Sequence, residues 1–365
     1  MHIQCKDSFR GCVLGRVPSA LILLMLFLLI LACSFPLAPL EHVSCGDHFL
    51  VRHILGQTSQ AQWVDWIARF SGEQPVEIGG ETMTIDTRFS HAMFAGQRNA
   101  RAFDYLYEQV SRWVAAEQIE VDPYIYTDEN GRSYEWKNLI VTLPGAIRPE
   151  EVIVLSAHLD STTVREGNPF EYAPGADDNG SGVATLMEAV RIYRAYYFAR
   201  TIRVIWFTGE EQGAVGSHAY LSDHPMENVL GVINLDMFAY DHNGDRCLEL
   251  HVGKLAASDV LGRCFVDMAE VYGYDFRYDY LIDQATDRSD HAAFWKKDVG
   301  AILVLENLIE QNIPGGCGIA DGNPYYHKPG DTLTNLDVAY GFDIARTALA
   351  TAAQLAQPLM PKPLP

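Results

Sequence analysis

Two side chains that commonly bind metals, His158 and Asp160, stand two positions apart just after the apolar run Val152–Leu155. A short continuous apolar run of this kind is typical of a buried strand. A second acidic pair, Asp177 and Asp178, directly precedes a glycine-containing stretch that opens a helix. In an open α/β sheet, ligands bind where strands end and helices begin, so this pattern predicts a metal site.

Further acidic and imidazole side chains follow other apolar runs. Glu210 and Glu211 end the run IRVIWFTG, and Asp236 directly follows GVINL. His327 lies in a loop rich in glycine and proline, shortly before the last expected helix. Because parallel strands end at the same edge of a sheet, these groups can meet although they are far apart in the sequence.

Each of these side chains has a simpler explanation when taken alone. An aspartate after a strand often caps a helix, and a pair of glutamates is usually solvated surface. Together, several such groups at one edge of an apolar sheet are costly to bury unless a cation pairs with them. Two histidines, two aspartates and one glutamate suit a pair of zinc ions with one bridging carboxylate. The doubled Glu210-Glu211 offers one ligand and one uncoordinated general base.

The surrounding pattern predicts strands that alternate with helices. A hairpin is expected at residues 119–126 and 134–143, around Asn130-Gly131. Further strands are expected at 152–157, 202–208, 229–235 and 301–305. Helices are expected at 58–70, 100–117, 182–197, 217–222, 256–272, 291–297 and 336–355. The alternation predicts a three-layer α/β fold, with helices on both faces of a mixed, mostly parallel sheet.

In its motifs, the chain resembles the co-catalytic dizinc aminopeptidase family. The matching stretches are SAHLDS, APGADDNGSG, FTGEEQGAVGS, NLDM and the Tyr-His before Gly-Asp-Thr, in the family's order. Bacterial leucyl aminopeptidase is the best-known soluble member, and glutamate carboxypeptidase and glutaminyl cyclase are relatives. The resemblance covers roughly residues 90 to 355 and implies the zinc-dependent exopeptidase fold with two Zn²⁺ ions.

The resemblance also implies a role for each expected ligand. His158 and Asp236 match the residues that bind one zinc, and Glu211 and His327 match those that bind the other. Asp178, rather than the aspartate before it, matches the carboxylate that bridges the two ions. On this interpretation all five side chains are metal ligands.

Two more positions match catalytic groups of the family. Glu210 matches the general base, and Asp160 matches the carboxylate that orients His158. The family also has a cis peptide bond after the bridging aspartate, which places one between Asp178 and Asn179. Substrate-binding residues stay unassigned. The stretch QATDRSDHAAFW lacks the tyrosine and cysteines that help form the pocket of the soluble leucyl enzyme, and has an arginine in that region instead.

The leading hypothesis is a zinc metallo-aminopeptidase that hydrolyses N-terminal residues from peptides with water activated at two metals. Acyl transfer by a glutaminyl cyclase is one alternative, and a carboxypeptidase or dipeptidase of the same fold is another. The turn GEEQGAVGS resembles peptidases more than cyclases. A non-enzymatic receptor on this fold is disfavoured, because such relatives lose ligands or the base and this chain keeps them all.

The first forty residues predict export from the cytoplasm. Lys6, Arg10 and Arg16 precede the apolar run Ala20–Cys33, which is the pattern of a secretory signal. The run is short for a membrane-spanning helix, which needs about 20 residues. Cleavage near Ala38, lipid attachment at Cys33 and a retained N-terminal anchor all stay open. We therefore expect a secreted or envelope-associated protein, with membrane attachment through this segment as one outcome.

The rest of the chain divides by pattern into a helical extension at residues 41–88, a catalytic domain at 89–357 and a tail at 358–365. The formal charge of −20 disfavours nucleic acid as a partner, and peptides are the expected substrates. The cysteines past the signal permit disulfides, although free thiols are equally compatible and the pairing is open: Cys45, Cys247, Cys264 and Cys317. The oligomeric state is also open.

Overall fold

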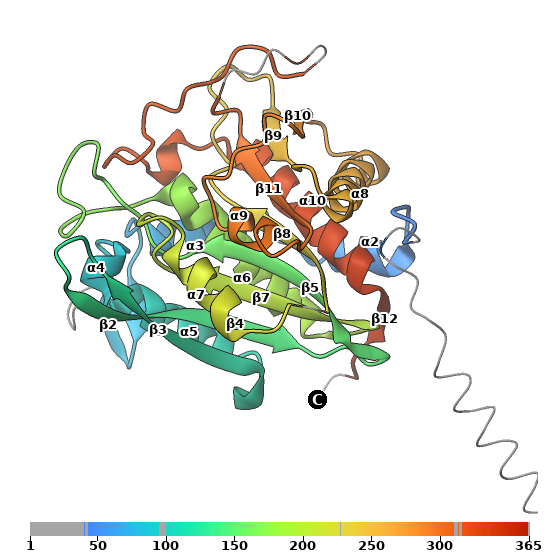
Figure 1. The fold of residues 1–365 in the computed structure, drawn as a ribbon, viewed down its shortest axis with the longest axis horizontal. Coiled ribbons are helices and arrows are strands. Elements are labelled where there is room, and N and C mark those ends of the chain that lie inside the picture. Colours follow the sequence, from blue (N-terminus) through green and yellow to red (C-terminus); the bar gives the residue numbers. More distant parts are fainter. Residues whose placement is uncertain are drawn as a thin grey trace, which may run out of the picture. The chain divides into compact units, whose positions relative to one another are not determined.

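The computed structural model describes residues 40, 43–94, 100–226, 228–309, 313 and 316–363. The expected export signal lies outside these residues, so its fate stays a prediction. In the part of the chain that the structure describes, no helix has the length and apolarity needed to cross a membrane. The residues from Val43 onward form one compact unit (Figure 1).

A sheet of eight strands carries the predicted site (Figure 1). In order across the sheet, the strands are β10 (Arg277–Leu281), β9 (Cys247–His251), β11 (Ala301–Glu306), β8 (Val229–Leu235), β5 (Arg148–His158), β7 (Arg200–Phe207), β4 (Ser133–Leu143) and β3 (Ile119–Thr127). The inner strands β11, β8, β5 and β7 run parallel, whereas β3, β4 and β9 pair antiparallel with their neighbours β4, β7 and β11. This mixed, mostly parallel sheet confirms the predicted fold class.

Helices cover both faces of the sheet. The helices are α6 (Gly182–Tyr193), α7 (Val215–Asp223), α8 (Ala256–Tyr272), α9 (His291–Trp295) and α10 (Val338–Ala356). Successive strand residues point to opposite faces. On β7, Phe207 packs with the residues of α7 and α9, whereas the indole of Trp206 points at α6, 3.5 Å from the Val183 carbonyl. α8 and α10 pack against each other and against the sheet (Figure 1).

The segment before the sheet packs against the start of α6. Its elements are α2 (Phe49–Leu55), α3 (Gln60–Phe70), β1 (Val76–Ile78), β2 (Glu81–Met83), α4 (Ser90–Met93) and α5 (Ala100–Ser111). Ser59 caps α3 by accepting a backbone N–H of the helix. The buried Trp63 donates its indole N–H to Thr185 in α6 at 3.0 Å. The domain boundary at residue 88 stays a prediction.

Some element bounds differ from the prediction. The helix expected at 100–117 ends at Ser111. The helix expected at 182–197 ends at Tyr193, because β6 (Tyr196–Phe198) pairs with β12 (Pro358–Pro361). The expected tail therefore begins with a strand. β9 and β10 are absent from the prediction, because charged residues inside these short strands hide their burial in the sequence.

Two disulfides join the cysteines whose pairing the sequence leaves open. Cys45–Cys264 links the segment before α2 to α8, and Cys247–Cys317 links the first residue of β9 to the loop after β11. The partners lie 219 and 70 positions apart, so local spacing carries no signal for either pair. Both crosslinks involve the half of the molecule that contains β9, β10 and α8.

Candidate metal centre

The predicted ligands come from the ends of neighbouring strands. His158 is the last residue of β5 and lies opposite Phe207, the last residue of β7. The turn after β7 carries Glu210 and Glu211, and Asp236 directly follows β8. Because these strands are parallel neighbours, the structure brings the four groups to one edge of the sheet, where the sequence places them.

Asp178 stands between the two histidines. His158 Nε2 lies 3.2 Å from Asp178 Oδ1, and His327 Nε2 lies 3.2 Å from Asp178 Oδ2. Each histidine also faces a second carboxylate. Asp236 Oδ1 lies 3.1 Å from His158 Nε2, and Glu211 Oε2 lies 2.9 Å from His327 Nε2. The five residues thus form two histidine–carboxylate groups that share one aspartate.

The donor set fits zinc. Imidazole nitrogens and carboxylate oxygens are common zinc ligands. Glu211 Oε1 is buried and has no hydrogen-bond partner among the described residues, which is unusual for a polar atom unless it binds an ion or water. His158, Asp178 and Glu211 offer ligand atoms that all lie within 4.8 Å of one another. These observations support zinc at the shared aspartate.

The site also attracts positive charge. Burial lowers the pKa of His327, but Asp178 and Glu211 outweigh this effect and raise it to about 10. Burial likewise disfavours the protonated form of His158, yet Asp236 and other carboxylates raise its pKa well above the usual value. Burial raises the pKa of Glu211 to about 7. Divalent cations bound here would replace the protons as the source of positive charge.

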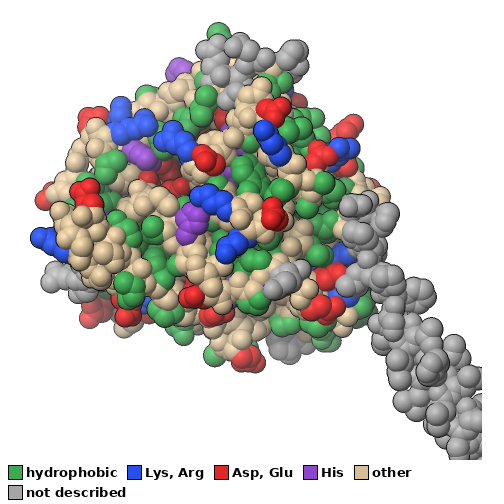
Figure 2. Space-filling view, viewed as in Figure 1, with side chains coloured by type: hydrophobic (Ala, Val, Ile, Leu, Met, Phe, Trp, Pro, Cys, Tyr) green, Lys and Arg blue, Asp and Glu red, His purple; other side chains and the backbone are tan. Residues whose placement is uncertain are grey.

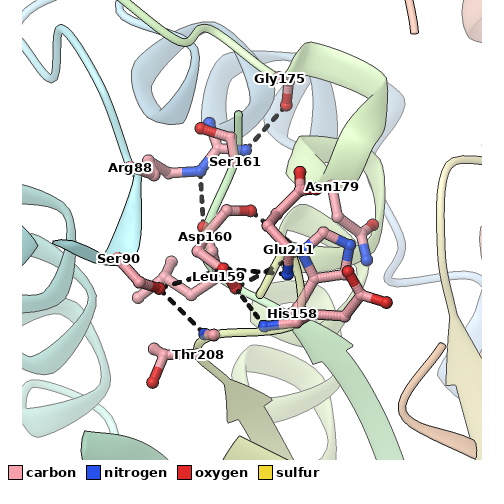
Figure 3. Close-up of polar contacts among 12 residues, drawn as sticks. Arg88, Ser90, His158, Leu159, Asp160, Ser161, Gly175, Asn179, Thr208 and Glu211 are labelled. Atoms are coloured by element: carbon pink, nitrogen blue, oxygen red, sulfur yellow. Dashed lines mark hydrogen bonds and ion pairs between the residues drawn. The ribbon is translucent and has the colours of Figure 1, made fainter. Parts of the chain in front are cut away.

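Asp160 contacts both His158 and the glutamate turn (Figure 3). His158 Nδ1 donates to the Asp160 carbonyl at 3.0 Å, and the Asp160 carboxylate lies 3.6 Å from the same nitrogen. A proton fixed on Nδ1 leaves Nε2 free to bind metal. The carboxylate accepts the backbone N–H groups of Glu210 and Glu211, both at 3.3 Å. Asp160 therefore positions the turn as well as the histidine.

Two residues without a predicted role support this arrangement from outside the sheet. Ser90 Oγ donates to Asp160 at 3.0 Å and accepts the Gly209 N–H at 2.9 Å. The buried guanidinium of Arg88 donates to backbone carbonyls near the end of β5, the strand that carries His158. One of these carbonyls is that of Gly175, at 2.8 Å (Figure 3). Sequence reasoning missed both residues, because they precede the first motif and no local pattern marks them.

A buried aspartate, Asp331, positions the shared ligand. Its two carboxylate oxygens accept the backbone N–H groups of Asp177 at 2.8 Å and of Asp178 at 3.0 Å. The peptide bond between Asp178 and Asn179 is cis, as the resemblance implies. Asp331 belongs to the Gly-Asp-Thr that follows His327, so the signal for it was present in the motif although no role was assigned.

Asp236 is held from the opposite side. Its Oδ2 accepts the Ser289 hydroxyl at 2.7 Å, while its Oδ1 faces His158. The side chain of Asn234 donates to the same Ser289 hydroxyl at 2.9 Å. Ser289 comes from the Ser-Asp-His run whose contribution the sequence leaves open, and its position shows that this run supports a ligand.

A cavity of about 330 Å³ opens over the carboxylates and histidines. We call one part of its lining the apolar half, which consists of Met237, Leu303, Leu305, Leu308 and Tyr326. We call another part the basic rim, which consists of His218, Arg288 and Lys296. The backbone is strained at Ala214 (φ 56°), Met237 (φ 35°) and His327 (φ 59°), which all line the cavity. Such strain is concentrated at functional sites.

We call the part of the lining at Thr286 and Ile309 the outer wall. Buried side chains on β9 and α9 hold it in place. The fully buried His251 faces Glu249 through Nε2 at 2.9 Å and accepts the Thr286 N–H at Nδ1 at 3.0 Å. His291 Nε2 donates to the Thr286 carbonyl at 2.9 Å. Glu249 accepts the Ile309 N–H at 2.6 Å. Since Thr286 and Ile309 line the cavity, these contacts fix two segments of its wall.

Comparison with protein families agrees with this arrangement. The model of peptidase family M28 matches residues 138–352, a region that contains every predicted ligand from His158 to His327. The chain belongs to peptidase family M28. It is a zinc-dependent metallopeptidase, a hydrolase of the aminopeptidase type.

This M28 peptidase is similar to curated aminopeptidases in sequence and to several solved structures in fold. A probable leucine aminopeptidase of Trichophyton verrucosum is 26% identical over 281 residues, which cover 74% of this chain and 70% of that protein. The crystal structure of the Legionella pneumophila LapA aminopeptidase superposes with a TM-score of 0.65 at 20% identity, covering 86% of this chain and 76% of that one. Porphyromonas gingivalis glutaminyl cyclase gives 0.63 at 17% identity, covering 80% and 97%. The two structures support the fold.

Proposed function

We propose that this M28 peptidase removes N-terminal residues from peptides with a site that holds two zinc ions. The observation that carries the proposal is the position of Asp178, which presents a different oxygen to each histidine. His158 and Asp236 would hold one ion, and Glu211 and His327 the other, with Asp178 shared. Bound zinc polarises a peptide carbonyl and makes water more acidic.

The proton transfers fall to Glu210. In the proposed reaction its carboxylate takes a proton from the attacking water and gives it to the nitrogen of the leaving peptide. Burial raises the pKa of Glu210 well above its ordinary value, which favours holding that proton between the two steps. Asp160 supports the base by fixing the backbone N–H groups of the turn. Glu210 is thus assigned the acid–base role and its neighbour Glu211 the ligand role.

The cavity supports exopeptidase action. Its volume of about 330 Å³ is at the lower end of the roughly 300–1,000 Å³ of small-molecule sites. The apolar half would take the side chain of the first substrate residue, and the carboxylates of the metal centre would attract its free amine. A protein segment with several more residues before the one in the apolar half would not fit so small a space, so we propose peptides with a free amino terminus as substrates.

Two measurements test this proposal. Zinc is removed with a chelator and returned in steps, and activity on leucine p-nitroanilide should reach its full value at two equivalents per chain. N-acetyl-leucine p-nitroanilide should not be cleaved, because it lacks the free amine. Full activity at one zinc, or cleavage of the acetylated substrate, would contradict the proposal.

A glutaminyl cyclase remains the second candidate because a cyclase has the same fold. Cyclisation is an attack of the substrate's own amine on an internal amide, and a base is still needed to carry a proton from that amine to the departing ammonia. Glu210 therefore fits both reactions, whereas the position of Asp178 between two histidine–carboxylate groups favours the two-metal peptidase. Glutaminyl peptides separate the two reactions: release of a pyroglutamyl peptide and ammonia would indicate the cyclase, whereas release of free glutamine would indicate the peptidase.

We also propose that the protein is exported. The support is the order of Lys6, Arg10 and Arg16 before the apolar run Ala20–Cys33, and the two disulfides agree with an oxidising compartment. N-terminal sequencing of protein recovered outside the cytoplasm should show a start between Cys33 and Glu41. Membrane-bound protein with an intact N-terminus would instead establish an anchor.

A further inference from the structure

The basic rim is unusual for so acidic a protein. The formal charge of the chain is −20, yet His218, Arg288 and Lys296 lie together at the mouth of the cavity. Figure 2 shows basic and histidine side chains side by side over the region where Figure 1 places α7 and α9. Among the described residues, no ion pair joins Arg288 or Lys296 to a carboxylate. Positive charge is therefore available at the cavity mouth.

Lys296 is held in place without losing its charge. Its Nζ lies 3.4 Å from His218 Nε2. Because an ammonium group can only donate, His218 must accept with a neutral ring. Burial lowers the pKa of His218, and the charge of Lys296 lowers it further, so the ring is neutral when the lysine is charged. The neutral partner restrains the ammonium but does not neutralise it.

The position of the rim indicates which part of a substrate it meets. The Glu210 carbonyl accepts the N–H groups of Gly213 at 2.8 Å and Ala214 at 2.9 Å, and both residues line the cavity. His218 follows one turn later on α7. Since Glu210 is assigned to protonate the leaving nitrogen, the leaving peptide lies on this side. The apolar half takes the first residue, and its side chains come from β11, the segments just after β8 and β11, and the loop before His327.

We propose that Lys296, assisted by Arg288, binds a carboxylate on the leaving side of the scissile bond. This inference rests on the proposed aminopeptidase function and names its substrate class: short peptides with a carboxylate close after the first peptide bond. Asp287 also lines the cavity beside Arg288, so Lys296 is the principal contact. Two sources can supply the carboxylate, the C-terminus of a dipeptide or an acidic second residue.

The test compares kcat/KM for matched substrates of the zinc-loaded full-length protein. Leucyl-leucine against leucyl-leucinamide tests the C-terminal carboxylate, and leucyl-glutamate α-amide against leucyl-glutamine α-amide tests the acidic side chain. The wild type should prefer the charged member of at least one pair by about 3- to 10-fold, as expected for a partly exposed charged contact. The preference should lie in KM, because the carboxylate is remote from the reacting bond.

Lys296→Gln should remove this preference, whereas Lys297→Gln should retain it. Lys297 is the matched control because it is the next residue, is also exposed and does not line the cavity. Arg288→Gln should weaken the preference partly, and added salt should reduce it in the wild type. The pair that responds to Lys296→Gln identifies the source of the carboxylate.

The inference and the function it rests on can fail separately. Equal kcat/KM values for both members of both pairs, with leucine p-nitroanilide still cleaved, would overturn the carboxylate site and leave the aminopeptidase intact. A preference that survives Lys296→Gln would also overturn the assignment. Failure to cleave any substrate with a free amine would overturn the proposed function and the inference together.

Discussion

On the metal side of the cavity the essential groups are side chains, and buried aspartates fix the backbone that carries them. Asp331 binds the N–H groups of Asp177 and Asp178, and Asp160 binds those of Glu210 and Glu211. On the outer side, the segment at Thr286 is fixed by its own backbone atoms, which contact His251 and His291. The metal side thus depends on the identity of the side chains that it presents, whereas the outer side depends on the position of its backbone.

The difference suggests a division of labour between the walls. Carboxylates suit the metal side because bound zinc would compensate the charge of the ligands, and backbone N–H groups pair with the carboxylates of Asp160 and Asp331. Neutral imidazoles suit the outer side because they can both donate and accept without bringing a charge into the core. Substitutions in the two walls should therefore damage different steps: chemistry and metal binding on one side, and substrate binding on the other.

The largest expected effect separates Glu210 from its neighbour in the metal wall. Glu210→Gln should reduce kcat by about 10²–10⁴-fold, because general-base catalysis is lost. Zinc content and KM should change little, since the amide has the same volume and the substrate contacts remain. Glu211→Gln is the paired variant and should lose zinc instead, as measured by metal analysis of the purified proteins. If Glu210→Gln lost zinc and Glu211→Gln kept it, the two roles would have to be exchanged.

The next largest effect concerns a residue that does not touch the ions. Asp331→Asn can accept only one of the two N–H groups, so Asp178 should shift and zinc affinity should fall by about 10- to 100-fold. Competition with a zinc chelator measures this change. Asp337→Asn is the matched control, because Asp337 accepts the Tyr340 N–H at the start of α10, where asparagine caps equally well. Equal zinc affinity in both variants would contradict the role of Asp331.

A smaller effect is expected in the outer wall. His251→Leu leaves the Thr286 N–H and the Glu249 carboxyl group without their partner, so the segment at Thr286 should loosen. We expect KM to rise by about 3- to 10-fold while kcat and zinc content stay close to wild type. His251→Asn should restore part of the loss, because its amide oxygen can accept the same N–H. A fall in kcat with unchanged KM would show that the two walls are not separable.

The last expected effect is a pH dependence of stability and leaves catalysis aside. Burial lowers the pKa of His291 to about 3, far below the roughly 6.5 of an unfolded chain. Between these values the unfolded chain binds the extra proton, so this histidine reduces stability as the pH falls. From pH 6.5 to 5 the loss should be about 1–2 kcal/mol.

Urea unfolding at both pH values measures this loss. His291→Gln keeps an N–H donor for the Thr286 carbonyl and cannot titrate, so it should lose less stability than the wild type over the same interval. His251 is a poorer probe, because burial raises the pKa of its partner Glu249 to about 8 and the two groups act in opposite directions. An equal loss in the His291→Gln variant would assign the acid sensitivity to other groups.

The two walls also differ in how well the sequence predicts them. The ligands could be found because each one directly follows an apolar run or stands in a short motif, and parallel strands put such ends together. Arg88 and Ser90 could not be found, because their contacts with Gly175 and Asp160 form only when segments far apart in the sequence meet. Asp331 is intermediate, since its motif was recognised but its hydrogen bonds depend on the path of another loop.

The outer wall escaped prediction for a physical reason. The strand CLELH contains Glu249 and His251, which look like surface residues in the sequence. Both are fully buried, and each is paired with the other and with the backbone of a loop. Alternation of polar and apolar residues normally separates an exposed from a buried face. A strand buried on both faces with satisfied polar groups breaks that rule, and the disulfide at Cys247 gives no local signal either.

The hydrogen bonds that hold the backbone of Thr286 affect which residues of this peptidase can be substituted. His251 and His291 contact only its peptide N–H and carbonyl, atoms that every residue except proline offers. The side chains of Asp287 and Arg288 can therefore be exchanged during evolution or in the laboratory without loosening the loop that displays them, whereas the Thr286 hydroxyl accepts the Arg288 N–H at 3.3 Å and should be kept. A library randomised at positions 287 and 288 should keep its zinc and its fold while the accepted peptides vary. The segment thus presents variable side chains on a backbone that stays fixed.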